Sequence, residues 1–255
     1  MFKKDGFVII KGFLDKNITQ EISISLENLL ISNQEQAIER IDQELFLVWS
    51  NVANGKSKKF NLDLLPQIRS NILTKKNIDF LKFQASTNFL QLFETVFFIK
   101  PALIGQGFPL HNDNCFFPLY PADHFSLWIA ISESTKENGC LKLRKGSHKD
   151  KIVLDLDIKR SGAILEKEEI FLAHASKFES IDIPLNPGDA VIFDGYCFHE
   201  SDPNTTSQDR VALSMRFLKQ PSSLLKNRSK FKSAEFVRQI EYCDNKMSAD
   251  IFPIF

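Results

Sequence analysis

A histidine and an aspartate stand one residue apart, as His111 and Asp113, in the stretch PLHNDNCFFP. If this stretch is extended, both side chains point to the same side of the strand, so an imidazole and a carboxylate would reach one ion. The alternative is a polar turn between two hydrophobic runs, because His-x-Asp pairs often occur by chance. The pair predicts a metal site only if a third ligand comes from elsewhere in the chain.

The third ligand that the sequence favours is His199, which follows the strand-like run AVIFDGYCF. It lies 86 residues beyond Asp113 (199 − 113), which in a barrel means several strands away and easily adjacent in space. Two imidazoles and one carboxylate on one face of a ferrous ion form the facial triad of non-haem iron oxygenases. Taken alone, His199 is more typical of a hydrogen-bonded histidine at a strand end.

Arg210 stands eleven residues after His199, at the start of the next apolar run. Pointing inward, its planar guanidinium would grip a carboxylate through two parallel hydrogen bonds. The alternative is a surface arginine that pairs with Asp209 or ends a loop. An inward Arg210 would give the metal site a partner for a carboxylate-bearing ligand.

The elements that must position these residues change character along the chain. Residues 17–33 predict a helix, because Ile18, Ile22 and Leu26 recur at helical spacing and Asn17 with Gln20 resembles a capping box. We expect further helical stretches over residues 34–46 and 78–93. Short apolar runs then follow one another, separated by turn formers such as ENG, NPGD and DPNTT: TVFFIKP, SLWIAIS, SIDIPL, AVIFDG and VALSMRFL.

The last of these runs shows the clearest strand pattern. In residues 211–217 apolar residues alternate with Ala212, Ser214 and Arg216, which predicts a half-buried strand. Helices followed by many short strands indicate a β-sandwich or barrel buttressed by N-terminal helices. We expect one domain over residues 1–255, with a helical part at about 15–94, a strand core at about 95–218 and a tail at 219–255. The tail is expected to hold a helix near residues 234–242 and to dock its apolar end, IFPIF, on the body.

Composition limits the function classes. Lys+Arg and Asp+Glu are both 32, so the formal net charge is zero and gives no support to a nucleic-acid or anionic-membrane binder. No apolar run approaches the roughly 18 residues that span a bilayer, and the N-terminal run is too short for a signal peptide. The four cysteines form no C-x-x-C pair, which favours reduced thiols. The sequence therefore predicts a cytoplasmic protein with a small-molecule substrate, and leaves its oligomeric state open.

Seven short motifs follow one another in order: His-x-Asp, Leu-Trp-x-Ala, Glu-Asn-Gly, Gly-Ser-His, Pro-Gly-Asp, His-x-Ser and an arginine eleven residues after the second histidine. The series is similar to that of the phytanoyl-CoA dioxygenase family, from about residue 97 to residue 217. DGFVIIKGFLD near the N-terminus resembles the first strand of that family. The resemblance implies an Fe(II)- and 2-oxoglutarate-dependent oxygenase on a double-stranded β-helix, a jelly-roll, cupin-like core that is mainly β with flanking helices.

The resemblance also implies roles for single residues. His111, Asp113 and His199 would be the catalytic iron ligands. Arg210 would hold the distal carboxylate of 2-oxoglutarate with help from the Ser201 hydroxyl. Trp128 matches a tryptophan that lines the cosubstrate pocket, and it fits a core aromatic on a strand equally well. The remaining histidines are not expected to be ligands: His124, His148 and His174.

Two departures from the family pattern concern charge. A turn that is usually apolar and contains proline is here Leu143-Arg144-Lys145. An upstream basic residue that helps to bind the cosubstrate in some members has no counterpart between Lys56 and Lys76. Neither departure touches the three metal ligands.

The resemblance implies that O2 and 2-oxoglutarate are consumed, that succinate and CO2 are released, and that an unactivated C–H bond is hydroxylated. Hydroxylation is expected because Asp113 is present where related halogenases have a small residue. Residues 51–60, 106–110, 155–177 and the tail would surround the barrel mouth, and they mix Lys, Asp, Glu and Phe. A long acyl tunnel needs a wide apolar lining, so a small or medium polar metabolite is expected. The alternative is an apolar substrate slot lined by four phenylalanines: Phe116, Phe117, Phe171 and Phe178.

Two other function classes compete with this interpretation. A cupin-like hydrolase or isomerase would use the same triad with zinc or manganese, but it gives no reason for Arg210 and Ser201. A non-catalytic 2-oxoglutarate-binding sensor would be a degenerate barrel, and the intact set of ligand residues argues against decay.

Overall fold

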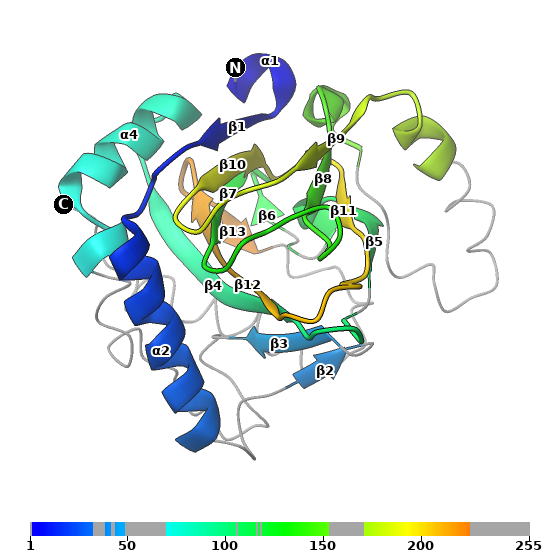
Figure 1. Ribbon diagram of the computed structural model, residues 1–255. Helices are drawn as coiled ribbons and strands as arrows, with labels where there is room; N and C mark the ends of the chain where they lie inside the picture. The colour runs from blue at the N-terminus through cyan, green and yellow to red at the C-terminus, as the bar shows by residue number, and fades with distance from the viewer. Residues whose placement is uncertain are drawn as a thin grey trace.

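The computed structural model describes residues 2–32, 39–41, 44–48, 70–105, 107–115, 117, 119–152 and 171–224. Two antiparallel sheets face each other in these residues, with helices beside the larger one (Figure 1). The large sheet has seven strands, in the order β1 (Phe7–Ile10), β10 (Ala190–Asp194), β7 (His124–Ala130), β12 (Arg210–Leu218), β4 (Gln91–Lys100), β3 (Glu44–Val48) and β2 (Glu39–Ile41). The small sheet has four, in the order β5 (Phe108–His111), β11 (His199–Ser201), β8 (Leu141–Arg144) and β9 (Ser180–Ile183).

The remaining elements flank these sheets. Strands β6 (Leu119–Tyr120) and β13 (Ser223–Leu224) form a two-stranded ribbon. The labelled helices are α1 (Phe2–Asp5), α2 (Lys16–Ser32) and α4 (Lys75–Ala85), and residues 70–72 and 171–175 are also helical. Single 3-10 turns lie at Asp113–Cys115 and Ser147–Asp150. This mainly β jelly-roll core with flanking helices confirms the predicted fold class.

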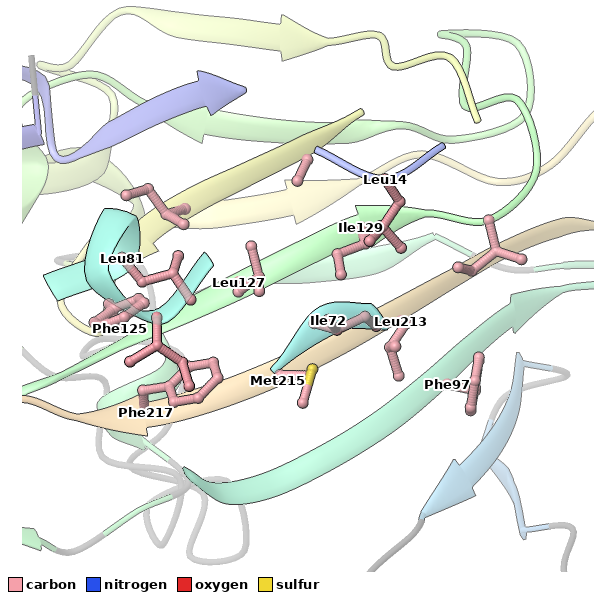
Figure 2. Close-up of a cluster of buried hydrophobic side chains, with 14 of the residues drawn as sticks. Leu14, Ile72, Leu81, Phe97, Phe125, Leu127, Ile129, Leu213, Met215 and Phe217 are labelled. Carbon is pink, nitrogen blue, oxygen red and sulfur yellow. The ribbon is translucent and has the colours of Figure 1, made fainter. Parts of the chain in front are cut away.

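The central strands β10, β7 and β12 of the large sheet are buried on both faces, and each face belongs to a different hydrophobic cluster. Figure 2 shows part of the cluster between the sheet and the helices, where Leu127 of β7 and Met215 of β12 pack with Leu81 of α4. The opposite face looks into the barrel and contributes Trp128 and Ala212 to a second cluster. The sheet therefore separates a helix-covered core from a barrel interior.

The prediction that residues 211–217 form a half-buried strand is wrong. Strand β12 is present, but every residue of it except Val211 is buried. The small and polar side chains Ala212, Ser214 and Arg216, which alternation would assign to solvent, lie on the face that looks into the barrel. Their small or polar character is a property of the barrel interior.

Three expectations for the N-terminal half need correction. The helix predicted over residues 34–46 is wrong where the structure describes it, because β2 pairs with β3 and β3 pairs with β4. The helix predicted over residues 78–93 ends at Ala85, where Ser86 adopts a left-handed backbone with φ of 54°, and β4 begins at Gln91. The strand core therefore does not begin at about residue 95. Strand β1 joins it from the N-terminus by pairing with β10.

Other expectations hold or lie outside the described residues. Helix α2 matches the prediction for residues 17–33, but its capping side chain is Asp15 rather than Asn17: Oδ1 of Asp15 accepts from the backbone N–H of Asn17 at 2.8 Å. The strands predicted from the five apolar runs are all present. The helix near residues 234–242, the docked end and Cys243 lie outside the described residues. The other cysteines are buried and form no disulfide with one another: Cys115, Cys140 and Cys197. The described helices include none with the length and apolar character needed to span a membrane.

Candidate metal centre

Strand pairing in the small sheet brings the three predicted ligands together. His111 ends β5 and lies opposite His199, the first residue of β11. The prediction that Asp113 lies on an extended strand is wrong, because Asp113 begins a 3-10 turn. The possible ligand atoms of the three buried residues still lie within 4.8 Å of one another, and Nε2 of His199 is 3.7 Å from Oδ1 of Asp113.

Both imidazoles are oriented by backbone carbonyls. Nδ1 of His111 lies 2.7 Å from the carbonyl oxygen of Pro109, and Nδ1 of His199 lies 3.0 Å from that of Cys197. Because a carbonyl oxygen only accepts, each Nδ1 carries the proton and each Nε2 presents a lone pair. Burial lowers the pKa of both rings, helped at His111 by the neighbouring His199. Both rings are therefore neutral, the form in which histidine binds a metal.

The Asp113 carboxylate is fully buried and held by two side chains of the large sheet. Its Oδ2 accepts from the Ser126 hydroxyl at 2.5 Å and from Nε of Arg216 at 3.2 Å, while Oδ1 accepts from Nη2 of Arg216 at 3.2 Å. Burial alone would raise the pKa of Asp113. The charge and hydrogen bonds of Arg216, together with the neighbouring His199 and His111, outweigh burial and hold that pKa well below its usual range. Asp113 is therefore ionised at any physiological pH.

Arg216 also contacts a second acid, Glu94 of β4, through Nη1. Burial works against the charge of Arg216, but the two carboxylates beside it raise the pKa of Arg216 above its ordinary value. Burial raises the pKa of Glu94, and the contact with Arg216 opposes that shift. Neither Arg216 nor Glu94 was identified from the sequence, because the two residues are 122 positions apart and belong to no motif.

The predicted cosubstrate residues lie on the barrel side of both sheets. Arg210 is 3% exposed, which excludes the surface alternative, and its Cζ lies 5.5 Å from the centroid of the Trp128 ring. Ser201 is buried on β11, two residues after His199. Lys100, which sequence reasoning missed, lies opposite Arg210 in the β4–β12 register and is fully buried. Its one sequence signal is a cation at the end of the apolar run TVFFIKP.

The other histidines have different partners. Nε2 of His124 lies 3.0 Å from Oδ1 of Asn114, and Nε2 of His174 lies 2.8 Å from the carboxylate of Asp150. His148 packs its ring against the backbone of Gly6. Within the described part of the chain, the triad is the one group of three or more acidic, histidine or cysteine side chains with metal-binding spacing.

Comparison with known proteins places the chain in a family. The model of the phytanoyl-CoA dioxygenase family matches residues 2–212. The chain belongs to this family. As a member it is an oxygenase enzyme of the oxidoreductase class, as the sequence resemblance implied.

Curated relatives agree with this assignment. The phytanoyl-CoA dioxygenase domain-containing protein 1 homolog of Dictyostelium discoideum is 25% identical over 254 residues, 85% of this chain and 88% of that protein. The methylphosphonate hydroxylase of Gimesia maris is 33% identical over 115 residues, 44% of this chain and 40% of that protein.

Two enzymes of nogalamycin biosynthesis share the fold. The carbocyclase SnoK has a TM-score of 0.69 at 16% identity, over 93% of this chain and 87% of its own. The epimerase SnoN, solved with Fe3+, alpha ketoglutarate and nogalamycin RO, has a TM-score of 0.64 at 19% identity, over 88% of this chain and 82% of its own.

Proposed function

We propose that this protein is an Fe(II)- and 2-oxoglutarate-dependent dioxygenase that hydroxylates an unactivated C–H bond of a small or medium polar metabolite. The overall conversion is C–H plus O2 plus 2-oxoglutarate to C–OH plus succinate plus CO2. The observation that carries the proposal is the buried cluster of His111, Asp113 and His199, with both Nε2 lone pairs and one ionised carboxylate converging.

The donor set of this cluster fits iron. Two neutral imidazoles and one carboxylate match the facial triad that non-haem Fe(II) oxygenases use, which leaves positions for a cosubstrate and O2. His111, Asp113 and His199 would hold the ion, and their second hydrogen bonds already fix each donor atom. A site prepared in this way loses little conformational freedom when it binds the metal.

Arg210, Ser201 and Trp128 fit the other end of a dicarboxylate. Arg210 would pair with the distal carboxylate of 2-oxoglutarate, and the Ser201 hydroxyl would donate to the same group. Trp128 lies beneath the guanidinium and would limit its movement. Ser201 lies two residues after His199 on strand β11, so both side chains point to the same face of the small sheet.

Bound iron and 2-oxoglutarate supply the activation of O2 that C–H oxidation requires. The residues of this chain would do the rest. Arg210 and Ser201 orient the cosubstrate, and the buried walls around Trp128 exclude water from it. Asp113, kept ionised by Arg216 and Ser126, keeps its carboxylate available to the metal.

A polar substrate is supported by side chains next to Asp113. Asn112 and Asn114 are buried, and so is His124. Among the described residues, Oδ1 of Asn112, Nδ2 of Asn114 and Nδ1 of His124 have no hydrogen-bond partner. Buried polar atoms in native proteins nearly always have one, so a polar ligand or water is expected here. The similarity to a methylphosphonate hydroxylase points in the same direction.

The test is succinate formation from 2-oxoglutarate by purified protein with Fe(II) and ascorbate, with one candidate substrate at a time. Amino acids, amines, phosphonates and long-chain acyl-CoA thioesters form the panel. We expect strong stimulation by one polar class, and a product that gains one oxygen atom from 18O2. Stimulation by acyl-CoA alone would overturn the polar-substrate proposal.

The same experiment separates the competing classes. A hydrolase or isomerase would convert its substrate without forming succinate or consuming O2. A sensor would bind 2-oxoglutarate without any turnover. A desaturation or cyclisation would form succinate, but its product would contain no 18O label.

A further inference from the structure

A row of four side chains crosses the large sheet directly opposite the metal ligands. In the strand register Glu94 of β4 lies opposite Arg216 of β12, and Arg216 lies opposite Ser126 of β7. Ser126 in turn lies opposite Phe193 of β10. Because residues paired in register share a face, the backbone places all four side chains at one level of the barrel interior.

Each member of the row except Glu94 contacts a predicted metal ligand. The ring centroid of Phe193 lies 4.8 Å from that of His199. Ser126 and Arg216 together donate three hydrogen bonds to Asp113. Glu94 reaches the site through Arg216 alone, whose Nη1 it contacts. The small sheet therefore supplies His111 and His199, and side chains of the large sheet contact His199 and Asp113 from the opposite side of the barrel.

The charges in this row are balanced. Arg216 places a cation against the Asp113 carboxylate, which alone would weaken the attraction of Asp113 for a metal ion. The Glu94 carboxylate offsets that charge, so the Glu94–Arg216 pair adds no net charge to the site. Asp113 keeps its own negative charge for the metal. The remaining effect of Arg216 is geometric, because its Nε and Nη2 bind both carboxylate oxygens and prevent rotation of the group.

We propose that Arg216, held in place by Glu94, is a positioning residue of the metal centre that fixes the orientation of the Asp113 carboxylate. This inference rests on the proposed metal-binding role of Asp113. It assigns a function to a buried arginine and a partly buried glutamate that belong to none of the sequence motifs. The pair acts on metal affinity and coordination, without itself touching the metal or the substrate.

The sharpest test removes the two-pronged contact between Arg216 and Asp113 without changing the net charge of the protein. In the double variant Glu94→Leu with Arg216→Met, a buried ion pair is replaced by apolar side chains, a change that folded proteins often tolerate. We expect Kd for Co²⁺, measured by calorimetry on the full chain without cosubstrate, to rise 10- to 100-fold, as is typical when a residue that orients a metal ligand is lost. The visible absorption of bound Co²⁺ should also change.

A second variant keeps the inference testable if the double variant does not fold. Arg216→Lys keeps the positive charge and loses the two-pronged contact, so it should raise Kd for Co²⁺ by a smaller factor. The matched control is Arg144→Met with Glu200→Leu. That arginine–glutamate pair has an Nη2–Oε1 distance of 2.5 Å and lies next to His199 in sequence, but its side chains are partly exposed. The control should bind Co²⁺ within about 3-fold of wild type.

The outcomes separate this inference from the proposed function. Wild-type Co²⁺ affinity and an unchanged spectrum in both Arg216 variants would overturn the positioning role and leave the metal site intact. An equal loss of affinity in the Arg144 control would overturn it too, because removing a charge pair that does not contact Asp113 would then have the same effect. A wild-type protein that binds neither Co²⁺ nor Fe²⁺ would overturn the proposed function itself.

Discussion

Strand β12 carries an arginine at each end of one face, and the two have different surroundings. Arg216 lies between two carboxylates, Asp113 and Glu94, which bind three of its nitrogen atoms. Arg210 lies over the Trp128 ring and next to Lys100 in the register. Both arginines are buried and look into the same barrel.

The difference shows how a buried arginine should be interpreted. A guanidinium placed between two carboxylates of its own chain supports the structure around it. A guanidinium buried inside the barrel and over an aromatic ring lies where an anionic ligand would be stabilised. The comparison therefore supports two separate proposals for the two ends of one strand, metal positioning at Arg216 and cosubstrate binding at Arg210.

The largest expected effect is on folding, at Arg216. Arg216→Ala would leave the carboxylates of Asp113 and Glu94 buried without their shared cation. Removing one partner of a buried charge network typically costs about 3–5 kcal/mol. We expect urea unfolding, followed by circular dichroism, to show a loss of that size. Arg144→Ala is the control, because its pair with Glu200 is partly exposed and should contribute about 1 kcal/mol or less. Equal losses of stability in Arg216→Ala and Arg144→Ala would contradict the structural role of the buried Arg216.

The two arginines also differ in how far the sequence identifies them. Arg210 is found because its signal is local: it stands at a fixed spacing after His199, on the next strand in the chain. Arg216 is missed because period-two alternation reports only that a side chain lies on the second face of β12. Whether that face meets solvent or a second sheet is decided by strands distant in sequence, such as β4 and β11.

The same limit explains the wrong helix over residues 34–46. Local residue types there fit a helix, but β3 pairs with β4 in a register that places Leu45 opposite Ile99. Such pairing over more than fifty residues overrides local propensity. The clustering of His111, Asp113 and His199, by contrast, agrees with the prediction, because His-x-Asp and His-x-Ser are short motifs and both histidines lie at strand ends. Lys100 was missed because a single lysine in an apolar run carries no spacing information.

The second effect is on cosubstrate binding, at the other end of β12. Arg210→Ala should weaken 2-oxoglutarate binding by about 2–5 kcal/mol, roughly 30- to 5,000-fold in Kd, because a charge-paired hydrogen-bonded partner is lost. Calorimetry on the Co²⁺-loaded protein measures this affinity, and the loss of folding stability should be smaller than in Arg216→Ala. An unchanged apparent affinity would show that Arg210 does not bind the cosubstrate.

The third effect is a pH dependence at the Arg216 end of the barrel. Burial lowers the pKa of His124 to about 4 from its ordinary 6.5. Because the pKa of His124 is lower in the folded state than in the unfolded state, protonation of His124 favours unfolding. The stability that neutral His124 contributes to the fold is therefore present above pH 6.5 and is lost as the pH falls toward 4. That loss amounts to roughly 3 kcal/mol. The charged groups that influence His124 are Asp113, Asp194, Arg216 and Lys219.

His124→Gln tests this contribution, because a glutamine can still donate to Oδ1 of Asn114 as Nε2 of His124 does. We expect the variant to lose less stability than wild type between pH 6.5 and pH 4 in urea unfolding. His111 and His199 also have lowered pKa values and titrate in both proteins, so only the difference between the two curves reports His124. Parallel curves would show that His124 is not the acid-sensitive group.

The smallest effect concerns Trp128 and decides whether it is a core aromatic or part of the cosubstrate site. Trp128→Phe keeps a buried ring beneath Arg210 but weakens the cation–π contact, which is strongest for tryptophan and worth about 2 kcal/mol between desolvated groups such as these. We expect Kd for 2-oxoglutarate to rise about 2- to 5-fold in this variant. A core role alone would lower the unfolding free energy and leave that Kd unchanged.

Combining Trp128→Phe with Arg210→Lys should give less than the sum of the two single effects on the Kd for 2-oxoglutarate, because both changes act on one contact. Full additivity would place Trp128 in the core only.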